Sequence, residues 1–185
     1  MELRLRNVID FNEPAKRFRF LLKSAVWLAV VMFVLGWVWQ SFGVVFNLTK
    51  SMPKGLYAYG PVKSIKRGQT VLVRMRSNSQ AMQLNDKRGY ALAGARWVKA
   101  VVGMPGDSVN TQGLVTSVCH RAHCRTFTCL THDRYGRALS CQRFNHLIIP
   151  KNHYFLAGTN SPKSFDSRYF GLAHRDEIVN TAWRI

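Results

Sequence analysis

The sequence predicts a mainly β protein, in which an antiparallel β domain follows a single N-terminal helix. The first observation is an apolar stretch without any charged residue between Lys23 and Lys50. The second is a series of short β-branched and aromatic runs after Phe46, which Gly, Pro and Asn residues separate. The third is the length of 185 residues with 47% hydrophobic residues, which leaves room for one packed domain and one further element.

The apolar stretch is long enough to cross a lipid bilayer. It covers residues 25–46 and is interrupted by Gln40 and Ser41. About 22 helical residues span roughly 33 Å, which exceeds the hydrocarbon thickness of about 30 Å. A buried core helix would be shorter and carry a polar face. A cleaved signal peptide would need a small-x-small site, which residues 46–50 lack. We therefore predict a transmembrane anchor over residues 24–46.

The charges around the anchor give only a weak indication of its orientation. Residues 1–23 contain six basic side chains, but the 22 residues that begin at Lys50 contain five more. Disulfides persist outside the cytoplasm, and the clustered cysteines therefore favour an orientation that places the C-terminal domain outside it. We expect residues 1–23 in the cytoplasm and residues 47–185 in the periplasm, with a single-pass anchor in a bacterial inner membrane.

Short strands account for most of the domain after the anchor. Residues 76–92 are polar and predict a short helix or a long loop, and residues 111–145 predict a loop-rich insert. The spacing of the remaining apolar runs favours an antiparallel β domain. These runs are residues 55–59, 70–74, 97–102, 146–149, 154–157 and 177–179.

Four cysteines are grouped within the insert. Their spacing lacks the Cys-x2-Cys pair of most zinc sites, so two disulfides are favoured and the three possible pairings stay open. Several histidines nearby keep a zinc site as the alternative, although we predict no metal and no cofactor. The cysteines are Cys119, Cys124, Cys129 and Cys141, and the histidines are His120, His123, His132 and His146.

Two segments contain a candidate nucleophile and a candidate base. Ser51 directly follows the anchor, and Pro53 favours an irregular, exposed turn at this point. Residues 97–102 form an apolar strand in which Lys99 has apolar neighbours on both faces. Burial disfavours the ammonium form and yields a neutral amine that can accept a proton from serine. A simple stop after the anchor and a lysine that reaches solvent are the structural alternatives.

A third segment, residues 158–171, combines several hydroxyl groups with Asp166 and Arg168. On a strand these two side chains would share one face and could form an ion pair. Taken alone, the segment would be a polar loop.

In this order, the three segments resemble the motifs of bacterial signal peptidase I. The closer match is the TraF-type peptidase of conjugative plasmid transfer. The resemblance covers the chain from the anchor to the C-terminus, apart from the cysteine-bearing insert. The motifs that carry it are Ser-Met-Pro-x-Gly-x-Tyr at residues 51–57, the Lys99 strand ending in Gly-x-Pro-Gly-Asp at residues 103–107, and Ser-Phe-Asp-Ser-Arg-Tyr-Phe-Gly at residues 164–171.

The resemblance implies a role for each matching residue. Ser51 would attack the scissile carbonyl and form an acyl-enzyme, while Lys99 would act as its general base. The backbone N–H of Ser51 and the hydroxyl of Thr49 would hold the oxyanion. Ser164 would orient the lysine amine. Substrate contacts are implied for Met52 and Pro53, and a supporting structural role for Asp166 and Arg168.

Two positions depart from the signal peptidase pattern. That family often has Arg directly after the catalytic lysine and Asp directly after the glycine of the last motif, where this chain has Ala100 and Thr159. The double change indicates that apolar or hydroxyl packing replaces an ion pair. It favours the specialised branch over the housekeeping enzyme.

These observations predict a membrane-bound serine endopeptidase that processes a secreted or pilin precursor for conjugative transfer or type IV secretion. The expected partners are a membrane-anchored protein substrate, the phospholipid surface and other secretion components. The net charge of +18 suits anionic lipid, and no nucleic-acid partner is expected. The alternatives are a general signal peptidase and a non-catalytic, basic, membrane-tethered binding protein. The sequence leaves hydrolysis and cyclisation of the product open.

Overall fold

The computed structural model describes residues 14–41, 43–76, 79–91 and 94–185 of the chain. It divides the chain into two compact units, the first ending at Ser41 and the second beginning at the next residue. Most of the predicted cytoplasmic segment, residues 1–13, lies outside the described residues.

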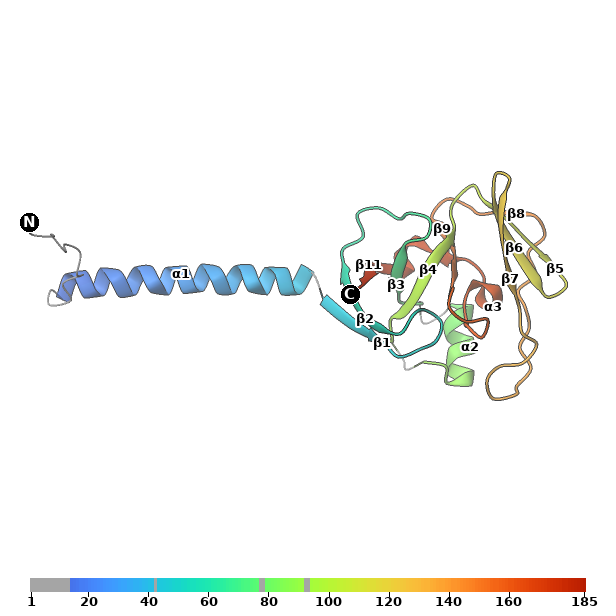
Figure 1. Ribbon diagram of the computed structural model, residues 1–185, viewed down its shortest axis with the longest axis horizontal. Coiled ribbons are helices and arrows are strands. Elements are labelled where there is room, and N and C mark those ends of the chain that lie inside the picture. Colours follow the sequence, from blue (N-terminus) through green and yellow to red (C-terminus); the bar gives the residue numbers. More distant parts are fainter. Residues whose placement is uncertain (1–13, 42, 77–78, 92–93) are drawn as a thin grey trace, which may run out of the picture. The chain divides into compact units, whose positions relative to one another are not determined.

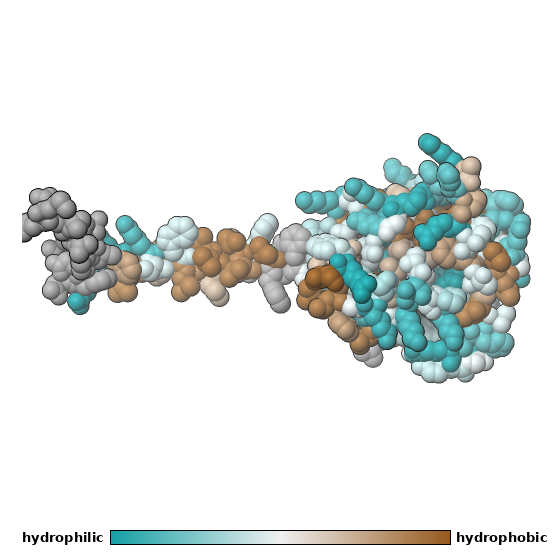
Figure 2. All heavy atoms as spheres, in the orientation of Figure 1, coloured by the Kyte–Doolittle hydropathy of each residue, from teal (hydrophilic) through white to brown (hydrophobic). Residues whose placement is uncertain are grey.

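The first unit contains helix α1, Pro14–Ser41 (Figure 1). Proline is well tolerated at a helix start, because its missing N–H would have no intrahelical partner there. Residues Arg17–Val38 have a mean hydropathy of 2.1 and none of this span is buried. Figure 2 shows mainly apolar side chains along the middle of the helix. The helix is therefore long and apolar enough to cross a membrane.

The helix ends earlier than the predicted anchor, which continued to residue 46. Gly43–Asn47 instead forms strand β1, which pairs antiparallel with β2, Gly55–Gly60. Glycine disfavours a helix and the adjacent valines favour a strand. Apolar composition alone does not separate these states, so the pairing with β2 decides the conformation.

The second unit is built on a seven-stranded sheet, and every pairing in it is antiparallel. This confirms the mainly antiparallel β fold class. In spatial order the strands are β1, β2, β11 (Ile178–Arg184), β3 (Thr70–Val73), β4 (Trp97–Gly103), β9 (His153–Ala157) and β10 (Ala173–His174).

A second sheet of four strands corrects the prediction of a loop-rich insert. Its order is β7 (His123–Thr128), β6 (Val115–His120), β5 (Ser108–Gln112) and β8 (Leu147–Ile148). Strands β5, β6 and β7 contain many Thr, Ser, His and Cys residues, so they lack a strong hydrophobic signal, whereas β8 lies within the predicted run 146–149. Their mutual pairing stabilises them, which a single-strand pattern does not reveal.

The prediction of two disulfides is confirmed, and the structure selects their pairing. Cys119 pairs with Cys124 across the β6–β7 hairpin, and Cys129 pairs with Cys141 across the following loop. Among the described residues, no group of three or more His, Cys, Asp or Glu side chains could hold a metal ion.

Short helices complete the second unit. Helix α2, Gln80–Arg88, lies in the polar segment for which a helix or loop was expected. Ser79 caps its N-terminus, and Gly89 ends it with a φ of 61° in the left-handed region. Helix α3, Ser167–Phe170, and the 3-10 turn Arg175–Glu177 lie near the C-terminus.

Strand β4 lies between β3 and β9 and contributes to both faces of the core. Val101 belongs to the cluster that contains Val71 and Leu156, and Trp97 packs against this cluster. Ala100 belongs to a different cluster that contains Met52. This alternation is the one expected for a strand buried on both sides, and it fixes the surroundings of Lys99.

Candidate active site

Lys99 is a buried lysine in the middle of β4. It lies opposite Val71 of β3, and only 5% of it is exposed. Burial lowers the pKa of Lys99 to about 8, with the Asp166 carboxylate opposing this shift and the Arg168 guanidinium adding to it. About a tenth of the amine is therefore neutral at pH 7 and able to accept a proton, far more than for a lysine of ordinary pKa.

The Lys99 amine is oriented by Ser164. Its Nζ donates a hydrogen bond of 2.9 Å to the Ser164 Oγ, and this contact is buried. Ser164 itself is 3% exposed. A fixed acceptor of this kind restricts the rotamers of a long side chain, and the role of Ser164 in positioning the amine stays a prediction.

Ser51 lies in an irregular loop between β1 and β2, and Asn47 organises this loop. The Asn47 amide N–H groups donate to the carbonyls of Thr49, Met52 and Pro53 at 3.1–3.2 Å. Its Oδ1 accepts from the backbone N–H and the hydroxyl of Thr49. A single side chain that is 4% exposed thus satisfies much of the loop's backbone.

The Ser51 hydroxyl lies 2.9 Å from the Thr49 hydroxyl. Since the Thr49 hydroxyl donates to Asn47, the Ser51 O–H donates to Thr49 in this state. For the described residues no direct hydrogen bond joins Ser51 to Lys99. Catalytic hydrogen bonds are often long without substrate and shorten when it binds.

Gly158 connects the Ser51 loop with the Lys99 side of the site. A Cβ added at Gly158 would overlap the Ser164 hydroxyl and lie 2.7 Å from the Ser51 carbonyl oxygen. The next contact along the chain comes from Asn160, whose backbone N–H donates to the Ser51 carbonyl and whose side chain donates to the Lys50 carbonyl, both at 3.1 Å. The residue after β9 must be glycine for the two segments to approach this closely.

Asp166 and Arg168 form the expected ion pair but do not lie on a strand. Asp166 caps the N-terminus of α3, and Arg168 lies within that helix. The guanidinium makes two parallel hydrogen bonds of 2.8 Å to the carboxylate, and both residues are almost completely buried. Asp166 also accepts from the backbone N–H of Gly158. These hydrogen bonds offset the desolvation cost of burying the two charges. The ion pair therefore stabilises the loop that carries Ser164.

A cleft of about 330 Å³ borders the loop that carries Ser51. Both Met52 and Pro53, the predicted substrate contacts, line it. So do Ala100 and Thr159, where signal peptidases often have charged residues, and the Thr159 hydroxyl lies 3.7 Å from the Met52 sulfur. The Thr159 hydroxyl and the Met52 thioether therefore pack against each other beside this cleft.

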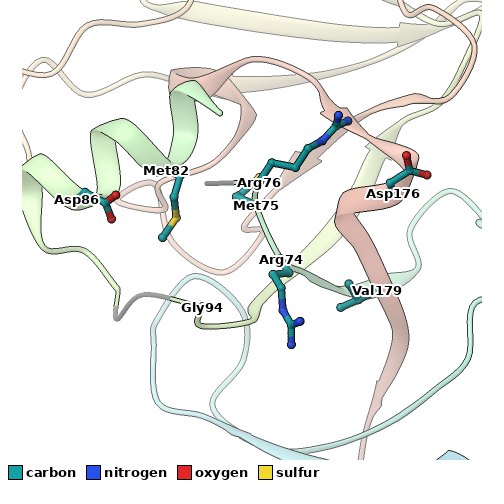
Figure 3. A pocket seen from close by; sticks show the side chains of 8 residues that line it. All are labelled: Arg74, Met75, Arg76, Met82, Asp86, Gly94, Asp176 and Val179. Atoms are coloured by element: carbon teal, nitrogen blue, oxygen red, sulfur yellow. The ribbon is translucent and has the colours of Figure 1, made fainter. Parts of the chain in front are cut away.

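A larger cavity of about 620 Å³ lies at the end of β3, beside α2 and β11 (Figure 3). Met75, Met82 and Val179 give it an apolar floor, and two arginines point in different directions from its edge. None of the predicted catalytic residues lines this cavity. Ser51 and Lys99 do not line the smaller cleft either, but Met52 and Ala100, the residues that follow them in the chain, do. The smaller cleft is therefore the one next to the predicted dyad.

Sequence reasoning did not identify Asn47 or Asn160 as site residues. Both hold the backbone around Ser51 through side-chain amides. Asparagine in an irregular segment is a weak signal, because it occurs in many turns. The partners of Asn47 lie in the loop that directly follows it, whereas Asn160 bonds Lys50 and Ser51, which are distant in the sequence.

A buried amine of lowered pKa beside a serine-bearing loop is a kind of site that can activate a serine hydroxyl. The family model described as "Signal peptidase, peptidase S26" matches residues 17–185. The chain belongs to this family, which implies a serine-type endopeptidase that acts on membrane-associated preproteins.

Comparison with solved structures gave a signal peptidase I from Enterococcus faecalis V583. It is 21% identical, with a TM-score of 0.36, and the match covers 63% of this chain and 95% of that chain. A comparison with curated proteins gave no significant match.

Proposed function

We propose that this peptidase uses a Ser51–Lys99 dyad to mature a pilin or another secreted precursor for conjugative transfer. The observation that carries the dyad is the buried Lys99 amine, which Ser164 holds beside the Ser51 loop. In the proposed reaction Lys99 accepts the Ser51 hydroxyl proton while the serine oxygen attacks the scissile carbonyl. The amine then returns this proton to the leaving amino group and activates a water molecule, or the substrate's own amino terminus, for deacylation.

Thr49 is the proposed side-chain donor to the oxyanion. Its hydroxyl lies beside the Ser51 oxygen but donates to Asn47 before substrate binds. A rotation about one bond would redirect this proton toward the developing negative charge. The Ser51 backbone N–H would supply the second donor, as in other oxyanion sites.

An apolar face at the edge of the large sheet supports action at a phospholipid surface. Strand register places its members on one side, because Phe46 lies opposite Leu56 and Ala58 lies opposite Trp183. Exposed apolar patches of this kind bind lipids or proteins. The exposed large apolar residues of this face are Val44, Phe46, Leu56, Trp183 and Ile185.

Charge and cysteine chemistry support the remaining part of the proposal. Residues 47–185 contain 21 basic and 6 acidic side chains, which favours contact with anionic lipid. Two disulfides favour the periplasmic side of a bacterial inner membrane for this domain. The restriction to conjugative substrates is supported by the TraF-like motifs and by two uncharged residues, Ala100 and Thr159, that line the cleft.

The test is processing of a candidate prepilin that is co-expressed with the wild-type protein, Ser51→Ala or Lys99→Ala and analysed by intact mass spectrometry. We expect cleavage by the wild type and none by either variant, with all three proteins present in the membrane. The product mass separates hydrolysis from cyclisation, which differ by one water. Processing by Ser51→Ala would refute the dyad and favour a binding protein, whereas cleavage of many unrelated preproteins would favour a general signal peptidase.

A further inference from the structure

The Cys129–Cys141 disulfide lies in the part of the chain that no signal peptidase motif covers. It links the end of β7 to the segment before β8. Cys129 is 1% exposed, and both sulfur atoms lie within 4 Å of the buried Thr116 hydroxyl of β6. The disulfide is thus packed against the small sheet instead of lying in a free loop.

The first end of this disulfide loop holds α3 through two hydrogen bonds. The carbonyl of Thr128 accepts from the Arg168 Nη1 at 2.6 Å. The backbone N–H of Leu130 donates to the Tyr169 Oη at 2.8 Å. Cys129 is the residue between these two backbone partners, so its position sets theirs.

The second end holds the backbone of the same helix. The N–H of Gln142, the residue after Cys141, donates to the Arg168 carbonyl at 2.6 Å. The Gln142 carbonyl accepts from the Thr111 hydroxyl of β5 at 3.1 Å. The disulfide therefore joins the two chain segments that hold Arg168, one by its side chain and the other by its backbone.

Arg168 in turn reaches the proposed base through Ser164. Its Nη2 donates to the Ser164 carbonyl at 3.0 Å, and its ion pair with Asp166 restrains the same turn. The Ser164 hydroxyl accepts from the Lys99 amine. A shift of Arg168 would therefore move the group that orients Lys99.

We propose that the Cys129–Cys141 disulfide is a positioning element of the active site, which holds Arg168 and through it keeps Ser164 against Lys99. This inference rests on the proposed role of Lys99 as the general base. The disulfide touches no reacting atom, and its contribution is to the geometry of the dyad.

The chain contains a matched control in its second disulfide. Cys119 and Cys124 lie directly opposite each other in the β6–β7 hairpin. The hydrogen-bonded ladder already fixes their register, so their bond adds little to the position of α3. Cys119→Ser/Cys124→Ser removes a disulfide from the same sheet without touching the contacts to Arg168.

The test compares this control with Cys129→Ser/Cys141→Ser in the full-length, membrane-embedded protein, using the substrate that the wild type processes. We expect a fall in kcat of about ten- to a hundredfold for Cys129→Ser/Cys141→Ser, with KM little changed, because the reacting groups are misplaced and the substrate cleft is retained. The acidic limb of its pH profile should also move to higher pH, because greater access of water favours the charged amine. The control should keep the wild-type kcat and pH profile.

Tyr169→Phe provides a second variant if Cys129→Ser/Cys141→Ser fails to fold. It keeps the disulfide and removes the acceptor of the Leu130 N–H, so we expect a smaller change in the same direction. A folded Cys129→Ser/Cys141→Ser variant with the wild-type kcat and the wild-type acidic limb would overturn the inference. An equal fall in kcat in both disulfide variants would also overturn it. If Cys129→Ser/Cys141→Ser does not fold, wild-type values for Tyr169→Phe would overturn it. Equal processing by the wild type and Ser51→Ala would instead refute the proposed function, and the inference would fall with it.

Discussion

Lys99 and Ser51 lie in contrasting parts of the same domain. Lys99 is 5% exposed in a central strand whose other side chains are apolar, whereas Ser51 is half-buried in a loop that polar contacts from Asn47 and Asn160 hold. A base of lowered pKa requires removal from water, which a sheet core provides. The proposed nucleophile, Ser51, must reach a macromolecular substrate, and its loop is accessible and held by hydrogen bonds. The contrast predicts that substitutions at Lys99 and substitutions in the Ser51 loop will reduce activity for different physical reasons.

The largest expected effect is a loss of activity without a loss of stability when Lys99 is replaced. Lys99→Met should lower kcat/KM by about 10²–10⁴-fold, because the proposed general base is removed. The thermal midpoint should be unchanged or higher, since an apolar side chain suits this buried position better than an amine does. Peptidase assays and thermal unfolding of the purified protein check both parts. A large loss of stability would contradict the view that Lys99 is retained for chemistry.

On the Ser51 side, Thr49→Val should reduce kcat by about 10²–10³-fold, because it deletes the proposed oxyanion donor while preserving the side-chain shape. Thr49→Ser keeps the hydroxyl and should keep most of the activity. Steady-state kinetics on one substrate distinguish the two variants. Equal activities for valine and serine would remove Thr49 from the proposed oxyanion site.

The pH dependence provides a third test of the Lys99 environment. The pKa of Lys99 is about 8, and only the neutral amine can accept the serine proton. Activity should therefore fall by about tenfold per pH unit well below pH 8 and level off above it. A kcat/KM profile of the free enzyme measures this limb. An acidic limb near pH 4 would indicate a carboxylate base and contradict the assignment.

The smallest expected effect concerns the loop itself. Asn47→Ala removes several hydrogen bonds from a nearly buried side chain, so we expect about 1–3 kcal/mol lower unfolding free energy. Activity should fall by about tenfold, because the Ser51 backbone loses its support. Denaturant unfolding and the peptidase assay measure the two effects. Asn85→Ala, a change at a buried asparagine within α2, is the control and should reduce stability without reducing kcat.

The sequence was sufficient to predict much of the large sheet and the motif residues. The runs that became β2, β3, β4 and β9 have strong hydrophobic signals. Strands β3 and β4 are buried on both faces, whereas one face of β2 belongs to the exposed apolar face. Strands β6 and β7 were missed because their residues are largely polar and their stability comes from each other. The apolar run beyond Ser41 was assigned to the anchor because composition does not distinguish a membrane helix from an apolar edge strand.

The sequence by itself was enough to identify the motifs that contain Ser51 and Lys99, the long apolar helix, and the order of these features along the chain. Residue type and local pattern carry that information. Tertiary structure alone decided which groups meet. It brought the Ser164 hydroxyl to the Lys99 amine, packed Gly158 against the Ser51 loop and selected the Cys129–Cys141 pairing. These contacts join residues far apart in the chain, so their geometry depends on strand register and on close packing. A local stretch of sequence specifies neither the strand register nor the packing.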